Sequence, residues 1–169
     1  MSDAVTPETM PQRAVVQFDC HGQAVGKMRN ELVVCMVKPF EERFELATDE
    51  GPFHGGDSSA PPPLALFVGG LTGCIMTQIR AFAKRLRVPL NDLSVDVRVQ
   101  WDWAAKDRVY ETAPKSFEID IALDSDAPMA DQHALIDAAK KGCFIEQTLG
   151  QSNTIRHRIR QGEDWIEVD

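Results

Sequence analysis

The sequence predicts an α+β fold, in which helices pack against antiparallel sheet. Short segments of alternating polar and apolar residues occur near both ends and in the middle of the chain, and one long segment repeats its apolar residues with helical spacing. The 169 residues, 43% of them hydrophobic, are enough to bury a core. We expect a flexible tail over residues 1–12 and a single domain over residues 13–169.

Three short strands are predicted in the N-terminal third of the chain. Residues 14–19 and 43–47 are strand-like, and residues 32–37 form a near-continuous apolar run of strand length. A turn is expected at residues 21–23, and Pro39 ends the second strand. Short turns between three such segments favour an antiparallel meander.

A long irregular connection, residues 48–63, precedes the most apolar segment of the chain. Its glycine pairs and three consecutive prolines disfavour regular structure, and long loops of this kind are often functional. A helix from Leu64 to Arg87 follows, because apolar residues recur there every three or four positions. Gly69, Gly70 and Gly73 are costly inside a helix and indicate that another backbone approaches closely.

The clearest strand signal lies after this helix. Residues 93–103 alternate strictly between apolar and polar side chains, and residues 117–123 do the same, so the two predict a pair of strands. The segment between them, residues 104–115, is expected to be a polar loop or hairpin turn. The remaining elements are expected as a helix that starts at residues 124–128 and runs to about Lys141, a short helical segment at residues 143–149, and strands at residues 154–160 and 165–168.

Charge and composition exclude several classes of protein. The formal net charge of −8 argues against nucleic-acid binding, which needs a basic face. We expect no membrane association, because Arg80 and the basic residues after it interrupt the longest apolar stretch. Asp3 and Glu8 make the N-terminus unlike a secretory signal, and a cytoplasmic location is expected.

The four cysteines, Cys20, Cys35, Cys74 and Cys143, are widely separated and form no CxxC pair. This pattern favours a reducing compartment over a disulfide-stapled secreted domain. Cys143 lies at the predicted start of a helix, where a thiol pKa is lowered, whereas Cys74 lies mid-helix and would need a cation from elsewhere. Free cysteines are also among the most buried residues, so from spacing alone both remain candidates for either reactivity or packing.

No metal site and no cofactor are expected. His21, His54, His133 and His157 show no ligand spacing, and of these His54, in the glycine-rich loop, is the candidate for a site residue. Walker, dinucleotide-binding and serine-hydrolase motifs are absent from the sequence.

The stretch GGDSSAPPPLALFVGGLTGCIMTQIRAFAKRLRVPLNDLSVDV resembles the signature of the OsmC/Ohr superfamily of osmotically induced and organic hydroperoxide resistance proteins. That signature is a glycine-rich loop, a proline-led long helix that carries a cysteine, and a VPL-led alternating strand. The segment CFIEQTL, from Cys143 to Leu149, is similar to the second signature, in which a cysteine opens a short helix. The resemblance extends from about Arg13 to Val168.

This resemblance implies an OsmC-like fold, in which antiparallel sheets wrap around two central helices in an intertwined homodimer with active sites at the subunit interface. It implies an antioxidant oxidoreductase of the oxidative stress response, a peroxidase that reduces organic hydroperoxides and, less well, hydrogen peroxide. Cys74 corresponds to the peroxidatic cysteine and Cys143 to the resolving cysteine. The hydroperoxide would oxidise Cys74 to a sulfenate, and Cys143 would then form a disulfide with Cys74. A lipoyl or thioredoxin-type dithiol would reduce this disulfide.

Two positions depart from the family pattern. Leu64 stands where Ohr-type members carry a glutamate, and Phe144 stands where a proline usually follows the second cysteine. Glu50 and Asp57 are the candidates to replace that carboxylate. The activating arginine of the family comes from an early loop or strand, and Arg29 is the nearest candidate, with Arg13 behind it.

The alternative hypothesis is a non-catalytic OsmC-like dimer that binds a small apolar or electrophilic ligand at the subunit interface. Leu64, Phe67 and Phe144 favour it slightly, because they are apolar where relatives are polar or small. With His54, they are the predicted substrate-binding residues. A third hypothesis is a structural dimer whose cysteines have no chemical role.

Overall fold

The computed structural model describes residues 13–168 of the chain. These residues belong to two compact units that divide between Leu66 and Phe67, and each unit is described by itself. Antiparallel sheets occur in both, together with helices, so the predicted α+β class is confirmed. The predicted tail, residues 1–12, lies outside the described residues, and the expectation of a single domain stays a prediction.

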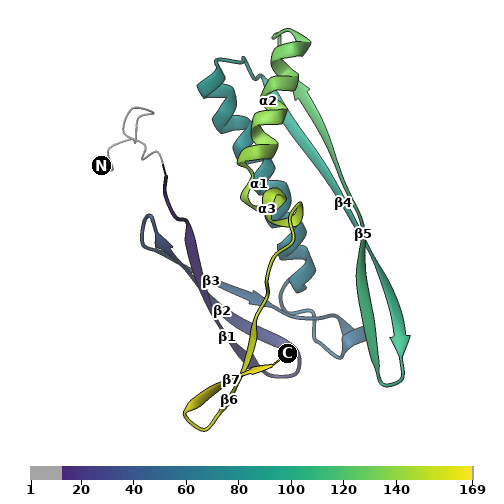
Figure 1. The fold of residues 1–169 in the computed structure, drawn as a ribbon. Coiled ribbons are helices and arrows are strands. Elements are labelled where there is room, and N and C mark those ends of the chain that lie inside the picture. Colours follow the sequence, from purple (N-terminus) through teal and green to yellow (C-terminus); the bar gives the residue numbers. More distant parts are fainter. Residues whose placement is uncertain (1–12, 169) are drawn as a thin grey trace. The chain divides into compact units, whose positions relative to one another are not determined.

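Figure 1 shows the order of the elements along the chain. They are β1 (Gln17–Val25), β2 (Arg29–Lys38), β3 (Glu42–Thr48), the 3-10 helix η2 (Pro52–His54), α1 (Pro63–Leu86), β4 (Asp92–Lys106), β5 (Val109–Asp124), α2 (Met129–Gly142), α3 (Phe144–Leu149), β6 (His157–Gln161) and β7 (Asp164–Val168).

The N-terminal unit contains the predicted antiparallel meander, with strand order β1-β2-β3. The turn expected at residues 21–23 is wrong, because these residues stay in β1 and pair with residues 31–33 of β2. The chain reverses instead at Gly26, whose φ of +70° lies in the left-handed region that glycine adopts without steric cost.

The connection between β3 and α1 is folded back on itself. The Asp49 N–H donates to the Pro61 carbonyl at 3.2 Å, and the Gly56 N–H donates to the Gly51 carbonyl at 3.1 Å. A Cβ atom at Gly56 would stand 1.9 Å from the Glu50 carbonyl oxygen, so no other residue fits there without moving the backbone. The segment therefore has a defined structure, although its composition disfavours helix and strand.

The sequence predicts α1 to within one residue at each end. The helix ends in a Schellman motif, in which Val88 N–H donates to the Ala83 carbonyl at 2.9 Å and Arg87 N–H to the Lys84 carbonyl at 3.4 Å. Arg87 itself takes the left-handed conformation, with φ +59°. Val88 is buried against the core just beyond the helix, which accounts for this stop without a glycine.

The glycines of α1 do not meet another backbone within residues 13–168. A Cβ at Gly70 would stand 3.5 Å from the Ile145 Cδ1, which is an ordinary contact with a side chain. A Cβ at Gly69 or Gly73 would meet no described atom within 4 Å. The close approach expected from these residues is therefore not seen in this chain.

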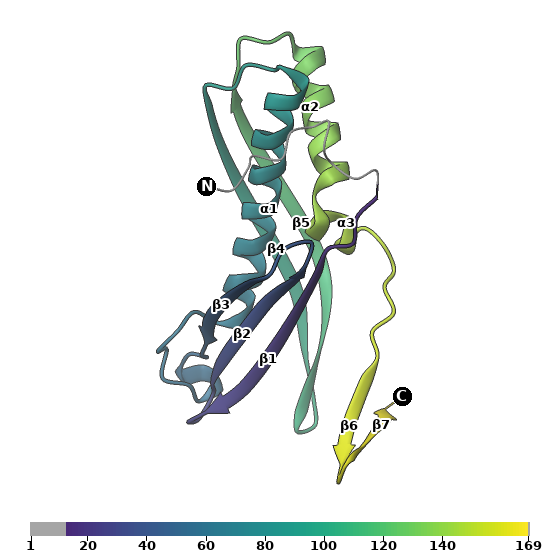
Figure 2. The ribbon, with the colours of Figure 1, turned by 90° about the vertical axis from the view of Figure 1, so that its left-hand side faces the viewer.

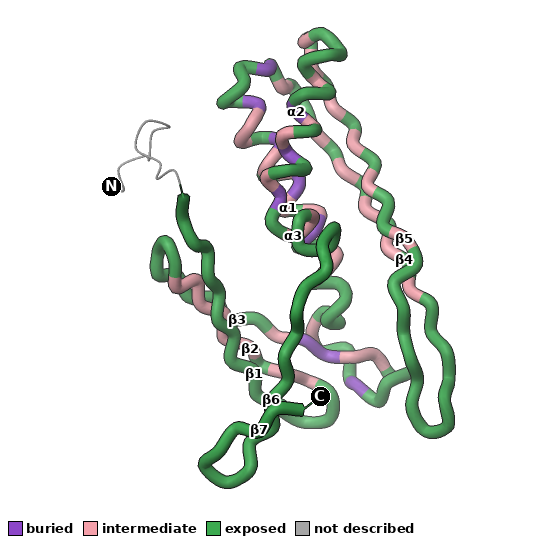
Figure 3. The backbone as a smooth tube through the Cα atoms, in the orientation of Figure 1, coloured by how far each residue is buried: buried purple, intermediate pink, exposed green. Residues whose placement is uncertain are grey.

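The core of the C-terminal unit lies between α1, α2 and the β4–β5 hairpin. Figures 1 and 2 show α1 and α2 running side by side, with the hairpin along them, and Figure 3 shows buried residues on the helices. Burial of apolar surface stabilises the packing of these elements, because the apolar stripe of each helix is removed from water. The buried residues of this cluster are Ile75, Ile79, Ala83, Val88, Leu135, Ala139 and Cys143.

By length and composition, α1 is long and apolar enough to cross a membrane. The expectation that Arg80 and the basic residues after it make the apolar stretch too short to span a membrane is therefore wrong, because residues 63–79 carry no charged side chain. The core helix of a soluble protein passes the same test, and α1 contributes buried residues to the core. That the protein does not associate with membranes stays a prediction.

The β4–β5 hairpin is longer than its alternating pattern predicts. Residues 104–106 and 109–115 belong to the strands, so the loop expected at residues 104–115 is wrong, and the reversal occurs at Asp107 and Arg108. The register shifts beside Trp101, which pairs with Pro114. Proline has no N–H to give to a ladder, and a bulge accommodates it. A second, short hairpin, β6–β7, reverses at Gly162, with φ +66°.

Candidate functional site

The structure brings the two predicted reactive cysteines together. Cys74 lies on α1, one helical turn after Gly70, and is half-buried. Cys143 lies at the junction where α2 ends and α3 begins, with extended backbone angles, and is fully buried. Cys74 packs against the buried cluster that contains Cys143, close enough to raise the pKa of that thiol, and both cysteines are free.

Gly142 allows this junction to approach α1. A Cβ at this position would stand 2.6 Å from the ring of Phe82 and 3.4 Å from the side-chain oxygen of Gln78, both on α1. Glycine at position 142 therefore leaves room for the Phe82 ring where α2 ends. It removes the side chain that would push Cys143 away from Cys74.

Burial raises the pKa of the Cys143 thiol to about 11. A hydrogen bond with Cys74 and the charge of a Cys74 thiolate raise the pKa further, whereas backbone N–H groups of Glu146 and Ile145 lower it. The expectation that the start of a helix lowers the pKa of Cys143 is therefore wrong, because desolvation outweighs the N–H groups. The Cys143 thiol therefore keeps its proton at neutral pH and is a poor nucleophile there.

Glu146, three residues after Cys143, was not predicted as a site residue but has a buried side-chain oxygen. The backbone N–H of Glu146 contacts Cys143, and its side-chain Oε2 is buried with no hydrogen-bond partner among residues 13–168. No periodicity signals this residue, because α3 has only six residues.

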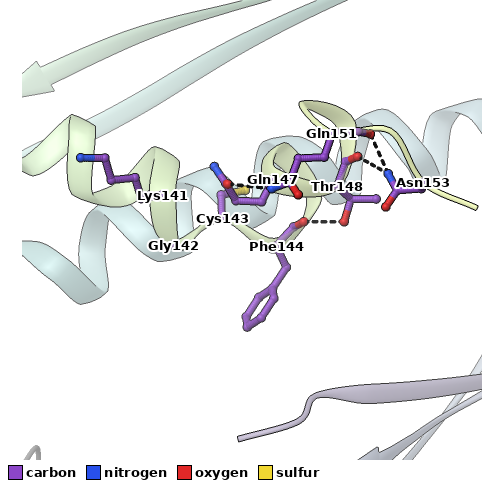
Figure 4. A pocket seen from close by; sticks show the side chains of 8 residues that line it. All are labelled: Lys141, Gly142, Cys143, Phe144, Gln147, Thr148, Gln151 and Asn153. Atoms are coloured by element: carbon purple, nitrogen blue, oxygen red, sulfur yellow. Dashed lines mark hydrogen bonds between the residues drawn. The ribbon is translucent and has the colours of Figure 1, made fainter. Parts of the chain in front are cut away.

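A surface hollow of about 490 Å³ lies next to Cys143 at the junction of α2 and α3. Figure 4 shows Lys141 at one end of the hollow and Phe144 projecting away from α3. Phe144 is 61% exposed and gives the hollow an apolar surface. The side-chain amides of Gln147, Gln151 and Asn153 line the hollow as well. It is lined by Lys141, Gly142, Cys143, Phe144, Gln147, Thr148, Gln151 and Asn153.

The other predicted apolar site residues have different surroundings. Phe67 packs in an aromatic cluster, with its ring 6.2 Å from Trp101, which in turn lies 6.3 Å from Phe117. Leu64 lies in the first turn of α1 and is 56% exposed. A binding role for either residue stays a prediction.

Arg29, the candidate activating cation, opens β2 in the N-terminal unit. Its Nε donates to Glu31 at 2.7 Å, and its Nη1 donates to both the carbonyl and the Oγ of Ser59, at 3.0 and 2.9 Å. Its Nη2 has no hydrogen-bond partner among residues 13–168. The guanidinium is thus held by three of its five N–H groups.

Asp49 is a buried carboxylate in the same unit, 2% exposed, and the sequence analysis missed it. Its Oδ2 accepts from the N–H and the hydroxyl of Ser59, at 2.9 and 2.7 Å, and these two bonds lower the pKa of the Asp49 carboxyl. A carboxylate directly after a strand was the available signal. The sequence suggests Glu50 and Asp57 as the carboxylates of the site instead. Of these two, Asp57 is not buried, because it forms an exposed ion pair with Lys27 at 3.0 Å.

His54 ends η2, and its ring lies 4.9 Å from the exposed Phe53 ring in an edge-on arrangement. A substrate-binding role for His54 stays a prediction. Among residues 13–168, no group of three or more His, Cys, Asp or Glu side chains could hold a metal ion.

The sequence and the structure of this chain are similar to those of known proteins. A family model described as OsmC-like protein matches residues 55–158. The chain is 68% identical to an OsmC-like hydroperoxide resistance protein from Jannaschia sp. CCS1, over 90% of this chain and 98% of that one, with a TM-score of 0.64. No match was found among curated proteins.

More distant solved structures share the fold. An OsmC-like protein from Mycoplasma pneumoniae is 17% identical over 79% of this chain and 87% of that one, with a TM-score of 0.60. An organic hydroperoxide resistance protein OsmC from Legionella pneumophila is 18% identical over 80% and 88% of the two chains, with a TM-score of 0.52.

Proposed function

Because this chain belongs to the OsmC-like protein family, we propose that it is a thiol-dependent peroxidase that reduces organic hydroperoxides in defence against oxidative stress. The observation that carries the proposal is the contact between Cys74 and Cys143, with the proton held on Cys143. The names of the Jannaschia and Legionella proteins, both described as hydroperoxide resistance proteins, support it.

The reaction that we propose begins at Cys74. Its thiolate attacks the terminal oxygen of the hydroperoxide, the O–O bond breaks, and the alkoxide leaves and takes up a proton to become an alcohol. Cys74 is then a sulfenic acid, oxidised by two electrons. Cys143 attacks the Cys74 sulfur, a disulfide forms, and the sulfenic hydroxide leaves as water with the thiol proton of Cys143. A dithiol of lipoyl or thioredoxin type then reduces this disulfide by thiol–disulfide exchange. Both protein thiols are restored, and the dithiol becomes a disulfide.

Consumption of cumene hydroperoxide in the presence of several dithiols tests this proposal. Turnover by the wild-type protein well above that of the free dithiol supports it. No turnover with any of the reductants contradicts it. The alternative, a ligand-binding dimer, would then be favoured by the exposed Phe144 over the hollow beside Cys143.

The raised pKa of Cys143 predicts which thiol reacts first with an alkylating agent. At a pKa of about 11, roughly one Cys143 thiol in 10⁴ is ionised at pH 7. We expect iodoacetamide at pH 7 to modify Cys74 much faster than Cys143, and labelling of Cys143 to increase as the pH rises toward 11. Peptide mass mapping over time measures both, with the exposed Cys20 as an internal reference. Equal rates at pH 7 would contradict the assigned order.

We further propose that the protein is a homodimer in the cytoplasm. Large apolar side chains are exposed on both hairpins of the C-terminal unit, among them Trp103 and Tyr110 on β4–β5 and Trp165 and Ile166 on β6–β7. Apolar surface of this extent marks a protein interface in many soluble proteins. Light scattering should give twice the mass of one chain at micromolar concentration. A monomer across the accessible concentration range would contradict the proposal.

A further inference from the structure

Three aromatic rings, from α1, β4 and β5, form one cluster within the C-terminal unit. The ring of Phe67 lies 6.2 Å from the ring of Trp101, and Trp101 lies 6.3 Å from Phe117 in an edge-on arrangement. Phe67 and Trp101 are half-buried and Phe117 is 39% exposed, so the cluster keeps accessible aromatic surface in this unit. Such a surface can take up a further ring, since aromatic rings attract one another edge to face or in offset stacks.

Trp101 lies at an irregular position of the β4–β5 hairpin. Earlier in β4, Val95 pairs with Ile121, and both pack against the buried core. Trp101 follows on the same face of the strand by alternation. The register shifts between Gln100 and Trp101, where Trp101 pairs with Pro114. Such irregularities redirect side chains and are common next to active sites, so the position of Trp101 suits a site residue.

Phe67 places this cluster on the helix face that carries Cys74. The two residues are seven positions apart on α1, which is within roughly 20° of two full turns and about 10 Å along the axis. Gly70 lies between them on this face, and a Cβ there would stand 3.5 Å from the Ile145 Cδ1. Cys74 and Ile145 both pack against the core and are only partly buried. Apolar side chains therefore border this face of α1 from Cys74 to the aromatic rings.

We propose that Trp101 is a specificity-determining residue, which together with Phe67 contacts the ring of an aryl hydroperoxide while the terminal oxygen of that hydroperoxide reacts at Cys74. This inference rests on the proposed peroxidase function and names the substrates that the site prefers, hydroperoxides with an aromatic ring on the carbon that bears the peroxide. The bonds that form and break at Cys74 are the same for aryl and alkyl hydroperoxides. Contact with the ring therefore changes only the stability of the transition state relative to free protein and free substrate.

The test compares the second-order rate constants for oxidation of Cys74 by cumene hydroperoxide and by tert-butyl hydroperoxide. These two probes differ only by a phenyl group in place of a methyl group, so the ratio of the two rate constants isolates the effect of the ring. Oxidation is followed as the loss of Cys74 thiol that can be alkylated after quenching, measured by peptide mass. We expect the wild-type protein to favour cumene hydroperoxide more strongly than the free amino acid cysteine does.

Trp101→Leu should lower this ratio by about fivefold and leave the rate constant for tert-butyl hydroperoxide unchanged, because the lost contact is with the phenyl ring. Trp101→Phe keeps an aromatic ring and should retain most of the preference. Phe67→Leu should lower the ratio in the same direction. Phe40→Leu is the matched control, because it removes an exposed ring between β2 and β3, and the ratio should stay at the wild-type value.

Two results would overturn the inference. One is a ratio that Trp101→Leu leaves unchanged. The other is an equal fall in both rate constants, which shows that Trp101 supports the fold around Cys74 and does not contact the ring of the substrate. Thermal melting identifies a variant that fails to fold, and if Trp101→Leu is such a variant, the ratio in Phe67→Leu decides between the same outcomes.

These outcomes differ from a failure of the proposed function. A wild-type protein whose Cys74 is oxidised by neither hydroperoxide would overturn both proposals. A reactive Cys74 with the same ratio in wild type and Trp101→Leu would overturn only the role of Trp101 and leave the peroxidase proposal standing.

Discussion

Replacement of Cys74 with serine is expected to abolish hydroperoxide turnover, leaving only the rate of the free dithiol. A serine hydroxyl is not ionised at neutral pH, and its oxygen cannot form the sulfenic acid on which the cycle depends. Because Cys74 is half-buried on α1 and serine is nearly isosteric, the fold should be retained. Turnover is measured as loss of cumene hydroperoxide, and circular dichroism checks the fold.

Cys143→Ser separates the two thiols, since it removes the attack on the sulfenic acid but leaves the first chemical step. We expect this variant to reduce about one equivalent of hydroperoxide per chain without added dithiol, and to leave a Cys74 sulfenic acid that a dione reagent traps. Cys20→Ser is the control for loss of a thiol, because Cys20 is exposed on β1. A Cys74→Ser variant that still turns over would contradict the role given to Cys74, and a fully active Cys143→Ser variant would contradict the resolving role.

Leu135→Ala is expected to cost about 2–5 kcal/mol of the free energy of unfolding, because it leaves a cavity in a closely packed core. Leu135 is completely buried on α2 and belongs to the cluster that includes Ile75, Ile79 and Cys143. Urea unfolding measures the change, and the midpoint of thermal unfolding should fall by about 5–15 °C for a chain of this size.

Asp137→Ala is the matched control for the core variant. Asp137 lies on the same helix but is exposed, so its replacement should change the free energy of unfolding by no more than about 0.5 kcal/mol. A Leu135→Ala variant as stable as Asp137→Ala would show that α2 does not depend on this core, and the placement of Cys143 beside Cys74 would lose its support.

Local patterns in the sequence are strong enough to predict the order of the elements. The three- and four-residue spacing of apolar side chains predicts α1 to within one residue, and strict alternation predicts residues 93–103 of β4. The signatures around Cys74 and Cys143 indicate the OsmC-like family, which the family model and the Jannaschia protein confirm. These features depend on residues close together in the chain, so a sequence displays them directly.

Two of the wrong predictions, the turn at residues 21–23 and the loop at residues 104–115, arise where pairing between strands outweighs local composition. Residues 21–23 have the composition of a turn but stay extended, because β2 continues opposite them and Gly26 provides the reversal. Residues 104–115 have the polar composition of a loop, yet most of them pair across the β4–β5 hairpin. Ladder hydrogen bonds satisfy the backbone in both cases, whatever the side chains prefer.

The sequence by itself determined the α+β class, the order of the elements and the family. Only the tertiary structure decided which thiol keeps its proton, because the burial of Cys143 comes from helices that are distant in sequence. It alone also joined Arg29 to Ser59, thirty residues away, and Ser59 to the buried Asp49. Desolvation and hydrogen bonding depend on what surrounds a group in space, and no local pattern of residues records those surroundings.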